Sequence, residues 1–189
     1  MAARALSCLV VVAGIAFASP ALAAPPPGIP CLYDALRPEE REIIQYLLMG
    51  NRYAGRSPFV ALDEPGGIKP YIDAAGELCR TTYGWSRARV RSAQTYTVSA
   101  LLRDALDSTL QTDGYDTSAI VDYFERVRQP VWSGRMSIDR ALAGLPGHLK
   151  ASGWEIRSAL TENLAKNYFI LLGTKENAAL GFAAGVYRP

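Results

Sequence analysis

The chain has 189 residues, carries a formal net charge of +2 and is 49% hydrophobic. A chain this apolar is not disordered, and a charge this small gives no general attraction to nucleic acid, so no nucleic-acid partner is expected. The residues that follow the N-terminal segment described next are enough for one domain with its own hydrophobic core.

Residues 1–23 have the pattern of a secretory signal peptide. Arg4 is their only charged residue, residues 6–18 are apolar, and an Ala-Leu-Ala motif ending at Ala23 places small residues where signal peptidase cleaves. We therefore expect a secreted, periplasmic protein with a side-chain charge of +1 after cleavage. An uncleaved anchor is the alternative, although the apolar run is short for a transmembrane helix. No later segment is apolar enough to predict a membrane span.

Two cysteines, Cys31 and Cys79, lie outside the expected signal peptide. In an oxidising compartment they predict one intrachain disulfide. A bond that closes a loop of this length stabilises a fold by roughly 4 kcal/mol in the chain-entropy model. Four prolines make residues 24–30 an extended lead-in, and we expect residues 31–189 to form a single domain.

Helical periodicity dominates the first half of this domain. Pro38 opens a predicted helix that ends at Gly50-Asn51. Its buried stripe would be Ile43, Ile44, Leu47 and Leu48. Residues 51–69 are expected to form a long loop, with a short extended piece over residues 59–62. A second helix is predicted over residues 70–83. Its inward residues would be Ile72, Ala75, Leu78 and Cys79.

The longest predicted helix begins after Ser86, a suitable N-cap, and runs to Gln111. Its length of about 39 Å suits a central element, although few apolar residues near 94–97 indicate a break. Four further helices are predicted. Two cover residues 118–128, ending before Pro130, and residues 137–143. A third is opened by a capping box at Ser152-Gly153-Trp154-Glu155 and closed by Gly173-Thr174, with Ile156, Leu160, Leu164, Tyr168 and Leu171 on its apolar stripe, and the fourth covers residues 176–184. The predicted fold class is all-α, a compact bundle of five to seven helices.

Charge is divided unevenly along the middle of the chain. Residues 80–103 hold five arginines and no acid, whereas residues 104–125 hold six acids and no base. Arginines beside aromatic rings suit carboxylates, phosphates or sugars. We therefore expect an anionic envelope ligand, either peptidoglycan, a lipid headgroup or an acidic glycan. The candidate ligand-binding residues are Arg87, Arg89, Arg91, Tyr83 and Trp85. Alternatively, the arginines pair with the downstream acids or cover a solvated surface.

A second candidate site is the carboxylate pair Asp73 and Glu77, spaced four residues apart on the second predicted helix. Two carboxylates on one helix face could supply acid and base for cleaving a cell-wall glycan if one of them were buried. Asp63 or Glu64 in the long loop could replace Asp73 as the partner. The simpler interpretation is a surface pair in which Arg80 neutralises Glu77.

The sequence gives little support for metal binding or for a catalytic thiol. His148 is the only histidine, and both cysteines of the domain would be spent on the disulfide, so we expect neither a metal site nor a cofactor. The leading hypothesis is a non-enzymatic binding or interaction protein, with the glycan hydrolase as the runner-up. A third hypothesis is a structural or chaperone-like subunit with a protein partner, which would expose an apolar face over residues 154–172 or 178–186.

Overall fold

The computed structural model describes residues 28–53, 57–62, 64–65 and 67–187, and these residues contain helices and no strand. The expected signal peptide and the first part of the lead-in lie outside the described residues. The elements are α1 (Cys31–Ala35), α2 (Pro38–Tyr53), the 3₁₀ helix η1 (Pro58–Leu62), α3 (Lys69–Tyr83), α4 (Arg87–Thr112), α5 (Ser118–Trp132), α6 (Ile138–Ala151) and α7 (Ala159–Ala184). The all-α prediction is confirmed.

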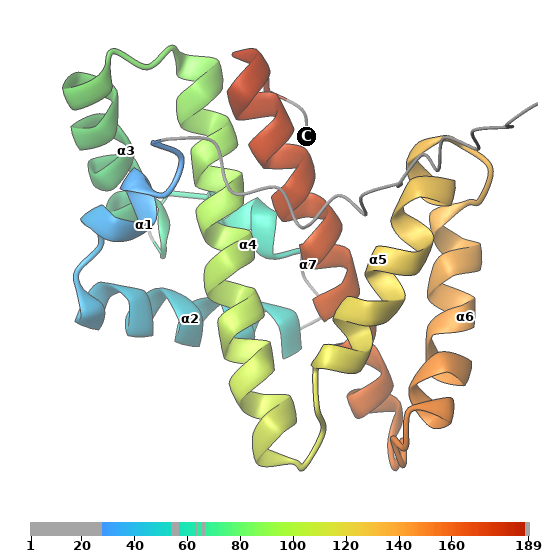
Figure 1. The fold of residues 1–189 in the computed structure, drawn as a ribbon. Coiled ribbons are helices and arrows are strands. Elements are labelled where there is room, and N and C mark those ends of the chain that lie inside the picture. Colours follow the sequence, from blue (N-terminus) through green and yellow to red (C-terminus); the bar gives the residue numbers. More distant parts are fainter. Residues whose placement is uncertain (1–27, 54–56, 63, 66, 188–189) are drawn as a thin grey trace, which may run out of the picture.

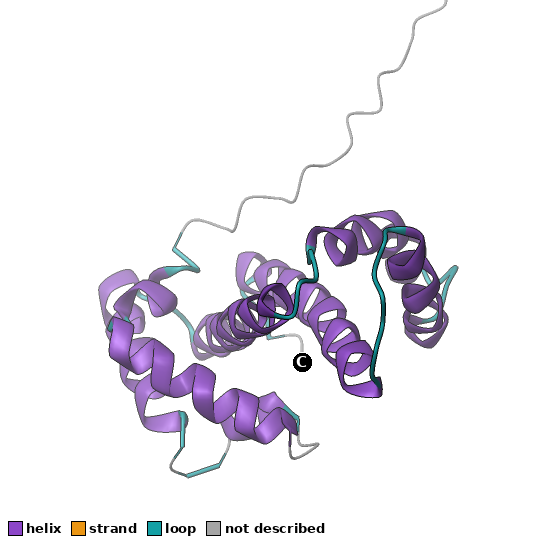
Figure 2. Cartoon of the chain, turned by 90° about the horizontal axis from the view of Figure 1, so that it is seen from below, coloured by secondary structure: helices purple, strands orange, loops and turns teal. Residues whose placement is uncertain are grey.

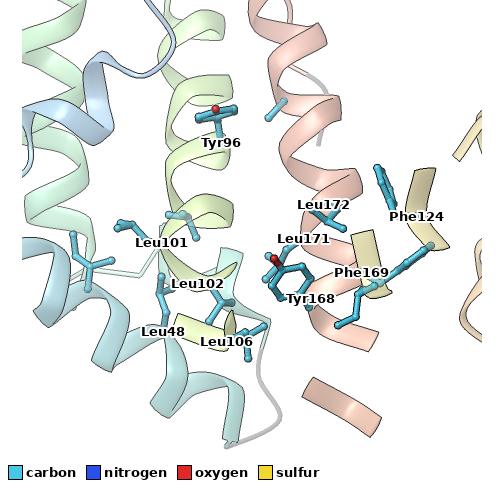
Figure 3. Packing of buried hydrophobic residues seen from close by; sticks show 14 of the residues in the cluster. Leu48, Tyr96, Leu101, Leu102, Leu106, Phe124, Tyr168, Phe169, Leu171 and Leu172 are labelled. Atoms are coloured by element: carbon cyan, nitrogen blue, oxygen red, sulfur yellow. The ribbon is translucent and has the colours of Figure 1, made fainter. Parts of the chain in front are cut away.

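Two antiparallel helices, α4 and α7, form the centre of the molecule. Helices α1, α2 and α3 lie on one side of this pair, and the α5–α6 hairpin lies on the other (Figure 1). The view from below shows the same three-part order (Figure 2). Leu102 and Leu106 of α4 point toward Tyr168 and Leu171 of α7 (Figure 3). None of the described helices combines the length and the apolarity needed to cross a membrane.

The predicted disulfide is present, with an S–S distance of 2.03 Å. It joins α1 to α3, and Cys79 is fully buried. The folded part begins earlier than Cys31, because residues 28–30 form a turn in which Ile29 is also fully buried. The last residues of the predicted extended lead-in are therefore part of the core.

Helix starts follow the local signals. Pro38 opens α2, with two glutamates in the first turn, where the helix dipole favours negative charge. Ser86 caps α4 as predicted, because its hydroxyl accepts a hydrogen bond from the Arg89 amide. At the end of α3, Gly84 adopts the left-handed conformation that glycine accepts without steric cost.

Helix α4 is continuous over 26 residues, so the predicted break near 94–97 is wrong. The apolar pattern is weak there because the helix is buried on every side and carries small polar residues instead of a single apolar stripe. Ser99 donates to the Thr95 carbonyl at 2.8 Å, and Ser92 donates to the Val186 carbonyl at 3.1 Å. Short polar side chains that bond to backbone allow helices to pack closely without a buried apolar stripe.

Four predictions for the first half of the domain differ from the structure. Ile43, predicted to lie on the buried stripe of the first helix, is 43% exposed. Helix α2 continues through Gly50 to Tyr53, since glycine costs only about 1 kcal/mol within a helix. The piece predicted as extended forms η1 instead. Leu78, predicted to face inward, is 58% exposed, because Gly76 faces the core in its place and allows α3 to approach α4.

Helices α5 and α6 also extend beyond their predicted ends. Helix α5 continues past Pro130 to Trp132, because a proline in the last turn removes only one backbone hydrogen bond. Helix α6 extends to Ala151, since Leu145 and Leu149 are fully buried beyond its predicted end.

The predicted capping box at Ser152 is wrong, as is the break at Gly173-Thr174. Ser152 ends α6, and Ser158 caps α7 by accepting a hydrogen bond from the Thr161 amide. Trp154 is instead held outside a helix, donating to the Asp116 carbonyl at 3.1 Å. Helix α7 then runs unbroken to Ala184 against α4, and Leu160, predicted to lie on its buried stripe, is 52% exposed.

Two glycines of α6 provide a matched test of how tightly this helix packs on α5. A Cβ at Gly144 would lie 2.4 Å from the Tyr123 hydroxyl, which donates to the Ala141 carbonyl at 2.8 Å, whereas a Cβ at Gly147 meets nothing within 4 Å. We expect Gly147→Ala to raise the free energy of unfolding by about 0.5 to 1 kcal/mol. Gly144→Ala should lower it by roughly 1 kcal/mol, because the clash outweighs the helix-propensity gain. Urea denaturation would measure both effects.

The control for this prediction is Tyr123→Phe, which removes the clashing hydroxyl. The next atom of Tyr123, Cζ, lies 3.5 Å from the Cβ position of residue 144, which is an ordinary contact. In the Tyr123→Phe background, Gly144→Ala should therefore be stabilising. A loss of stability in both backgrounds would contradict the packing described here.

Candidate functional site

A groove of about 480 Å³ lies between α3 and α4, near the start of α4. Figure 1 shows these two helices side by side at the upper end of the molecule. The groove is lined by Asp73, Glu77, Arg80, Arg87, Val90, Arg91 and Gln94. It therefore brings the predicted carboxylate pair together with two of the three predicted ligand-binding arginines.

The carboxylates belong to the α3 wall, and both are already neutralised by neighbours. Arg80 donates to Glu77 from Nε at 2.8 Å and from Nη2 at 2.6 Å. Asp73 forms an ion pair with Lys69 and accepts a hydrogen bond from Gln94 Nε2 at 3.0 Å. The expected surface pair of Glu77 and Arg80 is thus present, and the α3 wall presents little net negative charge.

The α4 wall carries Arg87 and Arg91, one helical turn apart, with Val90 beside them. Arg87 is exposed and has no ion-pair partner among the residues that the structure describes. Arg91 is half-buried, and its guanidinium carbon lies 5.8 Å from the ring centroid of Tyr187. Both arginines also lie at the positive end of the α4 dipole, so this wall attracts anions.

Gly76 allows the two walls to approach each other. A Cβ at this position would lie 3.2 Å from Val90 Cγ1 and 3.6 Å from Gln94 Nε2. Three residues later, Cys79 ties α3 to α1 through the disulfide. Close packing at Gly76 therefore sets the spacing of the two groove walls, and the disulfide separately fixes α3 against α1.

The protonation state of Glu77 bears on the hydrolase hypothesis. The hydrogen bonds and positive charge of Arg80 lower the pKa of Glu77 below its ordinary value, and the side chain is 62% exposed. A general acid in glycoside hydrolysis requires a raised pKa, which burial usually provides. Glu77 lies in a groove, but its environment favours the ionised form.

The remaining predicted ligand-binding residues lie outside the groove lining. Trp85 is buried and packs edge-on against Phe182, with ring centroids 4.9 Å apart. Tyr83 is 57% exposed and stacks on Trp85 at 5.8 Å, while the Arg89 guanidinium lies over the Phe182 ring, also at 5.8 Å. Tyr83, Trp85 and Arg89 therefore form a cluster with Phe182 that packs the region around the start of α4 against the end of α7.

Most of the described acids in residues 104–125 bind neighbours other than the groove arginines. Arg103 pairs with Asp104, as the simpler interpretation of the charge division expected, with an N–O distance of 2.8 Å. Asp107 is bonded instead to Thr117, Asp116 to Ser118, and Glu125 to Arg128. Among the described residues, pairing with these acids thus accounts for Arg103 but not for Arg87.

The alternative loop carboxylates are not part of the groove. Glu64 is exposed and lines a separate pocket of about 210 Å³ with Ile68 and Leu47. Asp63 lies outside the described residues. Two groove residues, Val90 and Gln94, were not predicted. Their spacing from Arg87, three and seven residues, could have indicated that they share its helix face.

Comparisons of the chain with protein-family models, with curated proteins and with solved structures each found no match.

Proposed function

We propose that this protein is a small, secreted binding protein of the cell envelope, and that its α3–α4 groove holds an anionic group of its ligand. The observation that carries the proposal is the unequal neutralisation of the two walls. Asp73 and Glu77 already have cationic partners, whereas Arg87 has none among the described residues. An anion beside Arg87 would balance the charge that this residue adds to the groove.

The chemistry of the groove suits a phosphate or a carboxylate. Arginine presents several donors in a planar fork, and such forks bind these groups through two parallel hydrogen bonds. Val90 offers an apolar contact beside the two guanidinium groups. Phospholipid headgroups, peptide stems of peptidoglycan and acidic glycans all carry groups of this kind.

The secreted location is supported by the signal-peptide pattern of residues 1–23. The Cys31–Cys79 disulfide is compatible with it, because such bonds persist in oxidising compartments.

The two other hypotheses have weaker support. The lowered pKa of Glu77 disfavours it as the acid of a glycan hydrolase. For a chaperone-like subunit, α7 exposes Leu160, Ile170 and Leu180. Residues spaced ten apart fall on different faces of a helix, so these three do not form one apolar stripe.

The groove predicts a specific loss of binding in the double variant Arg87→Ala, Arg91→Ala. The oxidised protein would be screened by thermal shift against muropeptides, glycerophosphate and acidic oligosaccharides, since a ligand of the native state raises the melting temperature. Hydrogen bonds to charged groups contribute about 1.5 to 3 kcal/mol each, so the double variant should bind the responding ligand at least about tenfold more weakly.

The matched control is Arg126→Ala, Arg140→Ala, which removes the same charge from exposed positions on α5 and α6. This control should bind like the wild type. Equal weakening in both double variants would indicate attraction by net charge alone. Unchanged binding in the groove variant would exclude the groove as the site.

A further inference from the structure

A second group of cations lies on the central helix pair, away from the α3–α4 groove. Lys175 of α7 is half-buried, and its Nζ lies 5.0 Å from the ring centroid of Tyr96 on α4. Arg103 lies two turns after Tyr96 on α4 and is close enough to Lys175 for the two charges to interact. Figure 3 shows Tyr96 on α4, with α7 running beside that helix.

One carboxylate interacts with these two cations, and its oxygens are already engaged. Asp104 Oδ1 accepts a hydrogen bond from Arg103 Nη2 at 2.8 Å, and Oδ2 faces the Tyr33 hydroxyl at 3.4 Å. Lys175 has no ion-pair partner among the described residues. The cluster of Arg103, Asp104 and Lys175 therefore carries one excess positive charge in a partly buried position.

Burial and the neighbouring charge both disfavour the protonated form of Lys175. Burial lowers the pKa of Lys175, and the charge of Arg103 lowers it further, while Asp104 opposes the change. Burial also raises the pKa of Tyr96 and of Tyr168, so both phenols stay protonated at neutral pH. Tyr96 can therefore donate a hydrogen bond beside the two cations.

We infer that Tyr96, Arg103 and Lys175 form a second anion site, which takes a compact phosphate group on the seam between α4 and α7. A bound phosphate would offset the repulsion between the two cations and accept hydrogen bonds from all three side chains. The site stands on α4 and α7, the most extensively packed elements of the fold, so its geometry does not depend on a loop.

The test uses the oxidised protein with inorganic phosphate and, separately, glycerol 1-phosphate, both at constant ionic strength. The variant is Lys175→Met, which keeps an unbranched side chain one atom shorter and removes the charge. It should fold at least as well as the wild type at neutral pH, since folding lowers the pKa of Lys175 and so disfavours its charged form. The control is Lys150→Met on α6, where the lysine is exposed.

We expect phosphate to raise the melting temperature of the wild type and of Lys150→Met. In Lys175→Met the affinity should fall at least about tenfold. The rise should persist in the Arg87→Ala, Arg91→Ala variant, which separates this site from the groove. NMR titration of labelled lysine side chains should show the pKa of Lys175 rising with phosphate, because a nearby anion favours the ammonium form.

The two probes distinguish a free ion from an ester. Stronger binding of inorganic phosphate indicates a free ion, and stronger binding of glycerol 1-phosphate indicates a phosphate ester. The inference is overturned if neither probe shifts the melting temperature, if the shift survives in Lys175→Met, or if it disappears with the groove arginines.

Discussion

The double variant Cys31→Ala, Cys79→Ala should lose about 4 kcal/mol of its free energy of unfolding, because it removes a cross-link that closes a long loop in the unfolded chain. The two cysteines are separated by 48 positions and join α1 to α3. The loss is a large part of the stability of a typical domain, about 5 to 15 kcal/mol. Alanine is chosen because serine would place a hydroxyl at Cys79, which is fully buried.

Urea denaturation of the oxidised wild type, the reduced wild type and the double variant would measure this effect. The reduced wild type and the variant should unfold at similar urea concentrations, well below that of the oxidised wild type. Their m-values should be larger, since an unfolded chain without the cross-link exposes more surface. Oxidised and reduced wild type with the same midpoint would contradict the structural role of the bond.

The second large effect is expected from Arg128→Ala, at the contact between α5 and α7. Arg128 is 5% exposed and forms ion pairs with Glu125 at 2.9 Å and with Glu176 at 2.8 Å. Removing one partner of a buried ion pair typically costs about 3 to 5 kcal/mol, because the remaining charge stays buried without compensation. Here two carboxylates would lose the same arginine.

The dependence on pH identifies the cause of this loss. Burial already raises the pKa of Glu176 above its ordinary value, while Arg128 lowers it, so the pKa should rise further without Arg128. A carboxyl whose pKa is raised by folding stabilises the fold at low pH, and this contribution disappears as the pH rises through the folded-state pKa. The deficit of the variant should therefore be larger at about pH 7.5 than at about pH 5.

Unfolding in urea at the two pH values would measure the difference. The matched control is Arg126→Ala, an exposed arginine on the same helix, which should change stability by less than about 0.5 kcal/mol at either pH. A deficit of Arg128→Ala that does not change with pH would indicate the lost contact of the guanidinium with the Trp132 ring and not the uncompensated carboxylates.

Fold class, disulfide and several helix starts could be predicted from the residues because each depends on a short stretch or on a count. Ser86 caps α4 through an amide three residues away, and two cysteines outside the signal peptide allow a single pairing. The central position of α4 followed from its length. The signal peptide and the secreted location remain predictions.

The groove could be predicted only in pieces. The arginines and the carboxylates were each identified from spacing along their own helix, but nothing in either stretch indicated that Asp73 and Glu77 would face Arg87 and Arg91. That arrangement depends on the angle between α3 and α4, which close packing at Gly76 permits. Trp85 was predicted to bind the ligand because the sequence did not show its actual packing partner, Phe182, which lies far away along the chain.

Helix ends, buried polar residues and ion pairs between helices depended on contacts between distant segments. Pro146 and Gly173 each lie within a helix that continues, since burying apolar residues beyond them offsets a local cost of about 1 to 3 kcal/mol. The cation cluster at Lys175 likewise exists only where α7 meets α4. The local sequence determines which conformation a segment prefers, whereas its burial depends on which distant segment packs against it.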